Sequence, residues 1–473
     1  AAGVQNRCVA GPPRPRAAAA MAASPTDTMP RGFRPAGAAT YGGDGTARAA
    51  VVAAARFPLV ERALWGEHGH RDSVFNTVVV PPWGDDAASD GAGAIIVAVG
   101  QDKRVIAWAL ADADEESPPP PVLAGVANDP QFSVVVVPPA MNGGEAPTLL
   151  TGGWGCYQLY EWALQPAVAQ LRGRSVSGAG TAGASASAAV AAAAAAAPKP
   201  IRLFDVGAKN GVMSIVLLPE TGCVAAASSD KHAYLWRYRS GKLIASTEAP
   251  DLALTGAMVA VPVATLPDSS SAGGGGGGGG GVPLDATATY LACGANAQSV
   301  AILRSDTLAV DAMLKVPGHE SAKSVVKALA CMAERQLLVA ACDQPASEVV
   351  VWHMPTRACV ARLKCRVAGP CYGLLACGND HFIMSEYSGD VCVWKLTAAA
   401  PGASDTGSSA GAPMMAVARV QELRTGLLLY GATAWGDRVI ISCNAPIVLV
   451  MCTSKWAQRG PAVCAWVAAW QWE

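Results

Sequence analysis

The chain has 473 residues, of which 51% are hydrophobic and 15% charged, with 35 basic and 36 acidic residues for a formal net charge of −1. This balance gives no electrostatic reason to expect nucleic acid or an anionic membrane as the main partner. The 14 cysteines form no Cys-x-x-Cys pair, so they are expected to be reduced and mostly buried, as in an intracellular protein. No stretch of about 20 strongly apolar residues predicts a membrane-spanning helix.

Residues 1–56 contain seven arginines against two acidic residues, Asp27 and Asp44, among many Ala, Pro and Gly residues. We expect a disordered extension, and the alternative is an organelle transit peptide, which is typically rich in Arg and poor in acids. A folded unit over residues 57–454 and a Trp-rich tail over residues 455–473 follow. A cytoplasmic or nuclear location is expected, with organelle import through the N-terminus as the alternative.

From residue 57 onward, short β-rich runs alternate with turn residues, which is typical of many short antiparallel strands. Seven segments read as a strand, a tight turn and a second strand, and they begin at Ala94, Thr148, Gly222, Thr289, Leu337, His381 and Arg438. Apolar runs precede most of them or follow several, as at Val74–Val80, Phe132–Val137, Val212–Leu218 and Cys359–Cys365. Four strands recurring seven times predict an all-β fold, a seven-bladed β-propeller with four antiparallel strands in each blade. Residues near Phe57 to His70 are predicted to supply the outer strand that closes the last blade.

Two of these segments place an Asp six residues before a Trp, namely Asp102 with Trp108 and Asp230 with Trp236. With the Gly-His pairs that end at His70 and His319, this pattern resembles the WD-repeat family over roughly residues 57–454. In that family Gly-His opens the repeat, an Asp lies in the turn after the second strand, and a Trp ends the third strand. Further single-position matches are Trp162, Asp343, Trp352 and Trp394.

The resemblance implies a buried hydrogen-bond tetrad in each blade, but the sequence departs from it. Ala98 and Ala226 stand where a hydroxyl is expected, and Ala208 stands where His is expected. A carboxylate in the turn can accept hydrogen bonds from backbone N–H groups, while the Trp is expected to lie between blades and bury about 150–250 Å². At about 25 cal/mol per Å², burial of the Trp stabilises the fold by several kcal/mol, whereas one hydrogen bond contributes about 1 kcal/mol net. We therefore expect a blade to remain stable when it lacks some polar groups of the tetrad. Equivalent positions in successive blades favour a structural role over a catalytic one for Asp102 and Asp230.

The extra length of the chain falls between the first and second strands and between the third and fourth strands of the blades. Because strand direction alternates, both loop classes emerge from one face of the disc, which we call the insertion face. The opposite, compact face is expected to bind partners. The candidate partner residues are Lys103, Arg104, Lys231 and His232 near its rim, together with Arg239. The alternative is that the insertions are neutral and do not indicate which face binds partners.

Two further sequence patterns give little support for a metal site or a phosphate-binding site. Cys359, Cys365, Cys371 and Cys377 recur every six residues ahead of His381, whereas zinc ligands usually lie two to four residues apart, so buried core cysteines are favoured. The glycine run at 273–281 lacks the Lys-Ser/Thr and the following helix of a phosphate-binding loop. We therefore predict no catalytic residue, no cofactor or metal site and no small-molecule substrate.

The segment "LWRYR" at 235–239 resembles part of the motif by which ubiquitin-ligase substrate receptors of the WD-repeat family dock an adaptor. It keeps Trp236 and Arg239, but Arg237 replaces the aspartate of the motif. In the tail, Trp466 and Trp470 would share one helical face, as an anchor for a groove or as packing against the propeller. The family resemblance implies a non-catalytic scaffold that binds protein partners within a larger assembly. The alternatives are a substrate receptor of a cullin-RING ubiquitin ligase and a propeller that binds or converts a small molecule.

Overall fold

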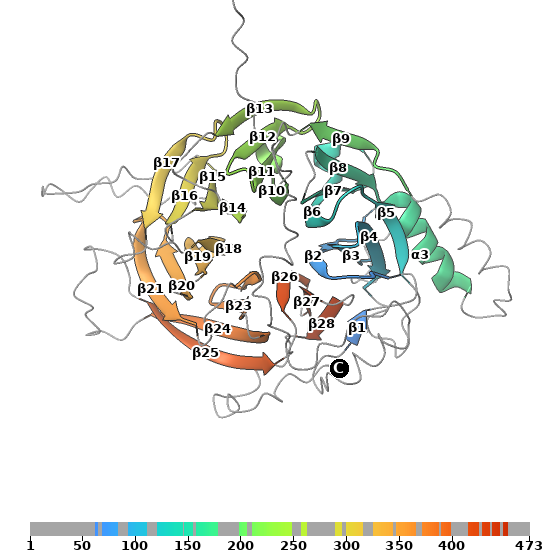
Figure 1. Ribbon diagram of the computed structural model, residues 1–473. Coiled ribbons are helices and arrows are strands. Elements are labelled where there is room, and N and C mark those ends of the chain that lie inside the picture. The colour runs from blue at the N-terminus through green and yellow to red at the C-terminus, as the bar shows by residue number, and fades with distance from the viewer. Residues whose placement is uncertain are drawn as a thin grey trace, which may run out of the picture.

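Seven four-stranded sheets are arranged in a ring around a central axis in the computed structural model (Figure 1). The structure describes residues 62–64, 69–83, 93–110, 121–144, 146–154, 158–177, 198–205, 211–247, 257–262, 289–295, 299–315, 325–343, 347–365, 371–386, 389–398, 415–424, 428–435, 438–444 and 448–452. Strands that follow one another in the chain pair in antiparallel fashion within each sheet. The predicted seven-bladed propeller is confirmed.

The strands of each blade are named from the axis outward. Blade 1 contains β2 Val74–Val80, β3 Ile95–Gly100, β4 Arg104–Ala109 and β5 Val122–Val126. Blade 2 contains β6 Gln131–Val137, β7 Thr148–Gly153, β8 Gln158–Ala163 and β9 Arg202–Asp205. Blade 3 contains β10 Val212–Leu218, β11 Cys223–Ser228, β12 Ala233–Arg237 and β13 Lys242–Thr247. Blade 4 contains β14 Met258–Val261, β15 Tyr290–Gly294, β16 Ser299–Arg304 and β17 Val310–Lys315.

The remaining blades complete the ring. Blade 5 contains β18 Val326–Met332, β19 Leu337–Cys342, β20 Glu348–His353 and β21 Ala358–Lys364. Blade 6 contains β22 Leu374–Cys377, β23 His381–Ser385, β24 Asp390–Ala398 and β25 Met415–Arg424. Blade 7 contains β26 Leu429–Trp435, β27 Arg438–Cys443, β28 Val448–Cys452 and, as its outer strand, β1 Arg62–Leu64. Short 3₁₀ turns lie at Pro219–Thr221 (η4) and Ala333–Arg335 (η5).

The ring is closed by the N-terminal strand, as predicted. β1 pairs with β28 in antiparallel fashion, with Arg62 opposite Val450 and Leu64 opposite Val448. The last blade therefore combines three strands from the C-terminal part of the described chain with one strand from its beginning. Closure of this kind joins the two ends of the ring, so neither end presents an unfinished blade.

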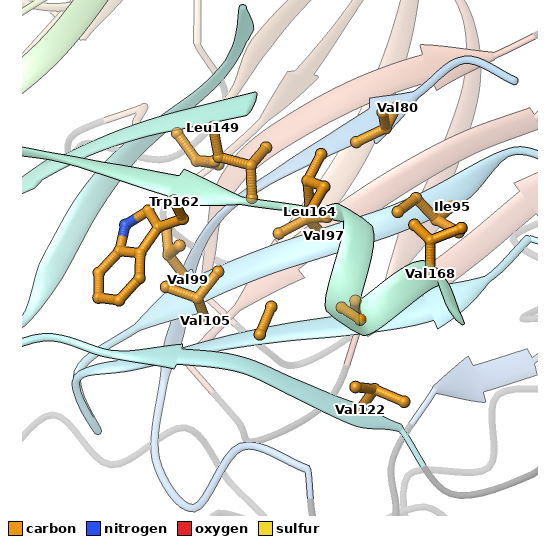
Figure 2. Packing of buried hydrophobic residues seen from close by; sticks show 14 of the residues in the cluster. Val80, Ile95, Val97, Val99, Val105, Val122, Leu149, Trp162, Leu164 and Val168 are labelled. Atoms are coloured by element: carbon orange, nitrogen blue, oxygen red, sulfur yellow. The ribbon is translucent and has the colours of Figure 1, made fainter. Parts of the chain in front are cut away.

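Large side chains near the ends of the third strands fill the space between blades. Trp108, Trp162, Trp236 and Trp352 are at most 1% exposed. Each belongs to a cluster that joins its own blade to the preceding one. Figure 2 shows this for Trp162 of blade 2, which shares its cluster with Val99 and Val105 of blade 1. The packing that the sequence predicts for these tryptophans is confirmed.

One helix was not predicted. The connection between β8 and β9, one of the places where the extra length of the chain falls, begins with helix α3, Gln165–Ser177, beside β5 (Figure 1). Ala167, Val168 and Leu171 are buried against blade 1. Because its buried side chains are few and mostly small, the helical repeat leaves little trace in the sequence. A shorter helix, α2, spans Pro139–Asn142, and neither described helix is long and apolar enough to cross a membrane.

The inter-blade packing can be tested at Trp236. Replacing it with Ala removes a fully buried indole between blades 2 and 3, so Trp236→Ala should lower the free energy of unfolding by about 3–5 kcal/mol. Arg237→Ala, at the next and exposed position, is the control and should change it by less than about 0.5 kcal/mol. Urea unfolding followed by far-ultraviolet circular dichroism measures the free energy of unfolding of both variants. Equal effects of the two variants would contradict inter-blade packing as the source of stability.

Candidate functional site

The turns between second and third strands lie on the compact face, and two of them have the same geometry. Lys103 in blade 1 and Lys231 in blade 3 occupy equivalent positions with positive φ of 66° and 76°. Both side chains are exposed, and Lys103 Nζ donates to the carbonyl of Asn128 at 2.6 Å. Arg104 is partly exposed and donates from Nη1 to the carbonyl of Gly69 at 3.1 Å. The repeated turn therefore presents a cation at the same place in blades 1 and 3.

The five candidate partner residues do not form one surface. Lys103, Arg104, Lys231 and His232 lie on the compact face, while Arg239 lies in the turn between β12 and β13, which opens on the insertion face. Arg239 Nε donates to the carbonyl of Met141, in α2 of the neighbouring blade, at 3.4 Å. Within the adaptor-like segment, Trp236 is fully buried, so only the arginine side chains are available to a partner.

In blade 1 the Gly-His residue and the turn Asp meet. His70 Nδ1 lies 2.9 Å from Asp102 Oδ1, and the backbone amides of Arg71 and Arg104 donate to the same carboxylate at 2.7 and 3.2 Å. Burial alone would raise the pKa of Asp102, but the hydrogen bond and charge of His70 and the two amides outweigh burial and lower that pKa from 3.8. The carboxylate thus ties the connection before β2 to the turn after β3.

The other half of this polar network is retained in blade 2. Trp162 Nε1 donates to Thr151 Oγ1 at 2.9 Å. The equivalent residue of blade 1 is Ala98, since Ala98 follows the partner of Trp108 by two residues, as Thr151 follows the partner of Trp162. Trp108 Nε1 and His70 Nε2 are buried and have no hydrogen-bond partner among the described residues. Blade 1 keeps the His–Asp contact, and blade 2 keeps the Trp–Thr contact.

In blade 3 the side chain that binds the turn Asp is a tyrosine, Tyr234, which the sequence patterns did not predict. The Tyr234 hydroxyl donates to Asp230 Oδ2 at 2.8 Å, and the His232 amide donates to Asp230 Oδ1 at 3.1 Å. Tyr234 also stacks on Trp236 with ring centroids 5.7 Å apart. A Tyr four residues after the turn Asp was the signal that could have indicated this contact.

The remaining repeat positions are less alike. The Asp343 amide donates to the carbonyl of Val325 at 2.8 Å, at the point where β18 begins. In blade 7, Asn444 Oδ1 accepts from the Leu428 amide at 3.0 Å, so an amide side chain takes the place of the turn carboxylate. Trp394 is 7% exposed between blades 5 and 6. His319 lies outside the described residues.

The inner strands show a repeated irregularity at their compact-face ends. In five of the seven blades the second residue of the inner strand is the extra residue of a β-bulge. These residues are Phe75, Phe132, Met213, Lys327 and Tyr430. A bulge re-aims a side chain out of the regular alternation of a strand. The β-bulge thus recurs in the inner strands around the compact-face end of the central axis.

Three of the bulged residues are aromatic and belong to a continuous chain of rings, which we call the aromatic arc. Phe75 stacks on Phe132 at 4.2 Å and meets Tyr430 edge-on at 5.0 Å between centroids. Tyr372 extends the arc beyond Tyr430 at 5.7 Å, and Trp154 extends it beyond Phe132 at 6.3 Å. Phe75 is buried at the centre, whereas the other four are partly exposed. The arc therefore spans blades 6, 7, 1 and 2 on the compact face.

Sequence reasoning missed the arc. Its signal was an aromatic residue in second position of three inner runs, "VFN", "QFS" and "LYG". In a regular strand this position would alternate with its neighbours, and only the bulges bring the rings together.

Among the exposed or partly exposed side chains of the described part of the compact face, cations outnumber carboxylates. The exposed or partly exposed cations at the described strand ends and turns of this face are Arg71, Lys103, Arg104, Lys231, Lys315, Lys327 and Lys364. The corresponding carboxylates are Asp72, Asp129 and Asp343. Asp102 and Asp230 are occupied by the contacts above. Among the described residues, the exposed charged side chains around the aromatic arc are therefore mostly cationic.

The four cysteines at six-residue intervals are divided between two blades and their connection. Cys359 lies on β21, Cys377 ends β22, and Cys365 and Cys371 lie between these strands. Burial, with the carboxylates of Glu386 and Glu348, raises the pKa of Cys365 to about 12, and burial raises the pKa of Cys377 to about 12. With pKa values this high, these thiols are protonated at neutral pH. Within the described part of the chain, no group of three or more His, Cys, Asp or Glu residues could hold a metal ion.

Comparison with known proteins gives a match in structure alone. No protein-family model and no curated protein matches the sequence. The crystal structure of the WD40 β-propeller domain of Doa1 is similar to this chain at 13% sequence identity and a TM-score of 0.49, over 83% of this chain and 96% of that one. The strand topology itself shows a seven-bladed propeller closed by its N-terminal strand, which is the architecture that the resemblance to the WD-repeat family implies.

The divided polar network predicts opposite effects of two substitutions. Ala98→Ser offers an oxygen to His70 Nε2 and Trp108 Nε1, so it should raise the free energy of unfolding by about 1 kcal/mol. Thr151→Ala leaves Trp162 Nε1 without its acceptor and should lower it by about 1–3 kcal/mol. Urea titration measures both. A destabilising Ala98→Ser together with a neutral Thr151→Ala would show that these positions are not equivalent.

The lowered pKa of Asp102 predicts a pH-dependent contribution to stability. A carboxyl whose pKa is lower in the folded than in the unfolded chain stabilises the fold above the unfolded value, here about 3.8, and this contribution is lost as the pH falls through the lowered value. Asp102→Asn should therefore destabilise the protein at about pH 7, and its difference from the parent should shrink below about pH 3.8. Asp72→Asn, an exposed change in the same connection, is the control. A difference that stays constant from neutral to acid pH would refute the effect.

Proposed function

We propose that this protein is a non-catalytic scaffold that binds protein partners on its compact face, with the aromatic arc as the main contact. The observation that carries the proposal is the set of bulges that places Phe75, Phe132 and Tyr430 next to one another. A bulge leaves one residue unpaired and locally disrupts the ladder, so its recurrence at aromatic positions supports a role beyond the core.

The chemistry of the arc supports protein binding. Tyr, Trp and Phe are enriched in the buried centres of protein interfaces, where they combine a large contact area with few rotatable bonds. Tyr372, Tyr430, Phe132 and Trp154 remain partly exposed, so a partner can cover them further. Because Phe132 and Tyr430 lie on strands, little conformational entropy is lost there when a partner binds.

The surrounding charges support selectivity among partners. A cationic rim accelerates the approach of partners with complementary charge and disfavours basic ones. Lys103 and Lys231 recur at equivalent turns, which supports the compact face as a surface with a defined charge pattern. Enzyme activity has no comparable support, since the polar turn residues Asp102 and Asp230 are occupied by contacts within the fold.

The proposal predicts that the arc is needed for partner binding and not for folding. In quantitative affinity purification from the source organism, the double variant Phe132→Ser with Tyr430→Ser should retain each specific partner at least about tenfold less than the parent, since loss of an aromatic anchor costs about 2 kcal/mol or more. Arg304→Ser, an exposed change on the insertion side of blade 4, is the control. Thermal unfolding checks that all three proteins are folded. Partners retained equally by the parent and the arc variant would exclude the arc as the docking site.

A further inference from the structure

A second surface with different chemistry lies on the outer rim of blades 2 and 3. Six large apolar side chains of the described residues are markedly exposed, and four of them lie on or next to the neighbouring outer strands β9 and β13 (Figure 1). These are Ile201, Leu203, Leu243 and Ile244, which are 59%, 48%, 41% and 42% exposed. Isolated exposed apolar residues are ordinary, but a group on two adjacent strands indicates an interaction surface.

Five cations accompany this apolar group, and we call the two sets together the basic rim. The cations are Lys199, Arg202, Arg237, Arg239 and Lys242. β9 begins and β12 ends on the insertion side, so all five gather at the same edge of the disc. One exposed carboxylate of the described residues, Glu220 in η4, lies on the same side of blade 3 as these cations.

Most of these cations have no acidic partner within the described chain. Arg237 Nη1 donates to the carbonyl of Thr221 at 3.2 Å, and Arg239 Nε donates to the carbonyl of Met141. Lys199 and Lys242 make no ion pair with a described carboxylate. The cationic groups of the rim therefore retain donors that an incoming carboxylate can use.

Arg202 shows how the rim is held in place. Its guanidinium lies over the Phe204 ring at 4.2 Å from the centroid and 4.0 Å from Glu161 Oε2. The Tyr238 hydroxyl of blade 3 donates to Glu161 of blade 2, and Thr148 Oγ1 donates to it at 2.9 Å. Burial and the hydrogen bond to Glu161 raise the pKa of Tyr238, so its proton stays in this contact. The buried network joins blades 2 and 3 directly beneath the rim.

We propose that the basic rim binds an acidic segment of a protein partner, in which Asp or Glu residues are interspersed with Leu, Ile or Phe. The carboxylates pair with the exposed arginines and lysines, and the apolar side chains cover Ile201, Leu203, Leu243 and Ile244. The exposed apolar side chains lie along strands, and β9 and β13 are edge strands, which suits an extended peptide better than a flat lipid surface. This surface is distinct from the compact face, so it adds a second binding site to the proposed scaffold.

The experiment uses the full chain and a phage-displayed library of random 12-residue peptides. Selection on the parent should enrich sequences that combine Asp or Glu with Leu, Ile or Phe. Fluorescence anisotropy with the enriched peptide should then show about tenfold weaker binding to the variant Arg237→Glu, Arg239→Glu, Lys242→Glu, and weaker binding at higher salt. Leu243→Ser with Ile244→Ser should also weaken binding, which a purely ionic attraction would not show. The matched control, Lys103→Glu with Lys231→Glu on the compact face, should bind as the parent does.

Each other outcome overturns the proposal in a distinguishable way. Absence of an acidic consensus excludes this class of partner. Loss of binding in the compact-face control alone assigns the peptides to the compact face, which leaves the scaffold function intact and removes the basic rim. Binding to vesicles of phosphatidylcholine and phosphatidylserine without binding to any enriched peptide would make the rim a membrane surface. Circular dichroism confirms that the variants are folded.

Discussion

The packing of large third-strand side chains between neighbouring blades is the interaction on which the rest of the structure depends. Trp108, Trp162, Trp236 and Trp352 each close the space to the preceding blade, and Leu303 takes this position in blade 4, opposite Leu291 as Trp236 is opposite Val224. An aromatic side chain buried here contributes several kcal/mol, which exceeds the net gain from any single polar contact nearby. The ring thus depends on shape and apolar area.

Because the apolar layer dominates, the polar groups beside it are free to differ from blade to blade. Blade 1 retains the His70–Asp102 pair, blade 2 retains the Thr151–Trp162 pair, and blade 3 replaces the histidine by Tyr234 on the same strand as its tryptophan. The first ties the connection before β2 to the turn after β3, the second ties β8 to β7, and the third ties β12 to the turn before it. Because these polar contacts differ between blades, they stabilise individual turns and strands. The arrangement of the blades in a ring depends instead on the burial of the third-strand side chains.

The two proposed recognition surfaces lie on parts of the molecule that the core does not need. Bulges at the compact-face ends of the inner strands bring Phe75, Phe132 and Tyr430 together without altering the blades behind them. On the outer strands of blades 2 and 3, apolar side chains and cations remain exposed above the network around Glu161 that joins these blades. One surface is aromatic and lies near the axis, and the other is basic and aliphatic and lies at the rim. A scaffold with two such surfaces can bring different partners together.

The sequence by itself determined the blade count, the order of strands and the closing strand, because alternation, turn residues and the Asp-to-Trp interval are local and repeat along the chain. Runs such as Val74–Val80 and Val212–Leu218 correspond to β2 and β10 residue for residue. Only the tertiary structure decided that α3 covers blade 1, that Arg239 lies on the opposite face from Lys231, and that the aromatic arc exists. These features depend on contacts between residues far apart in the chain, and on one-residue bulges that leave no mark in a pattern of period two.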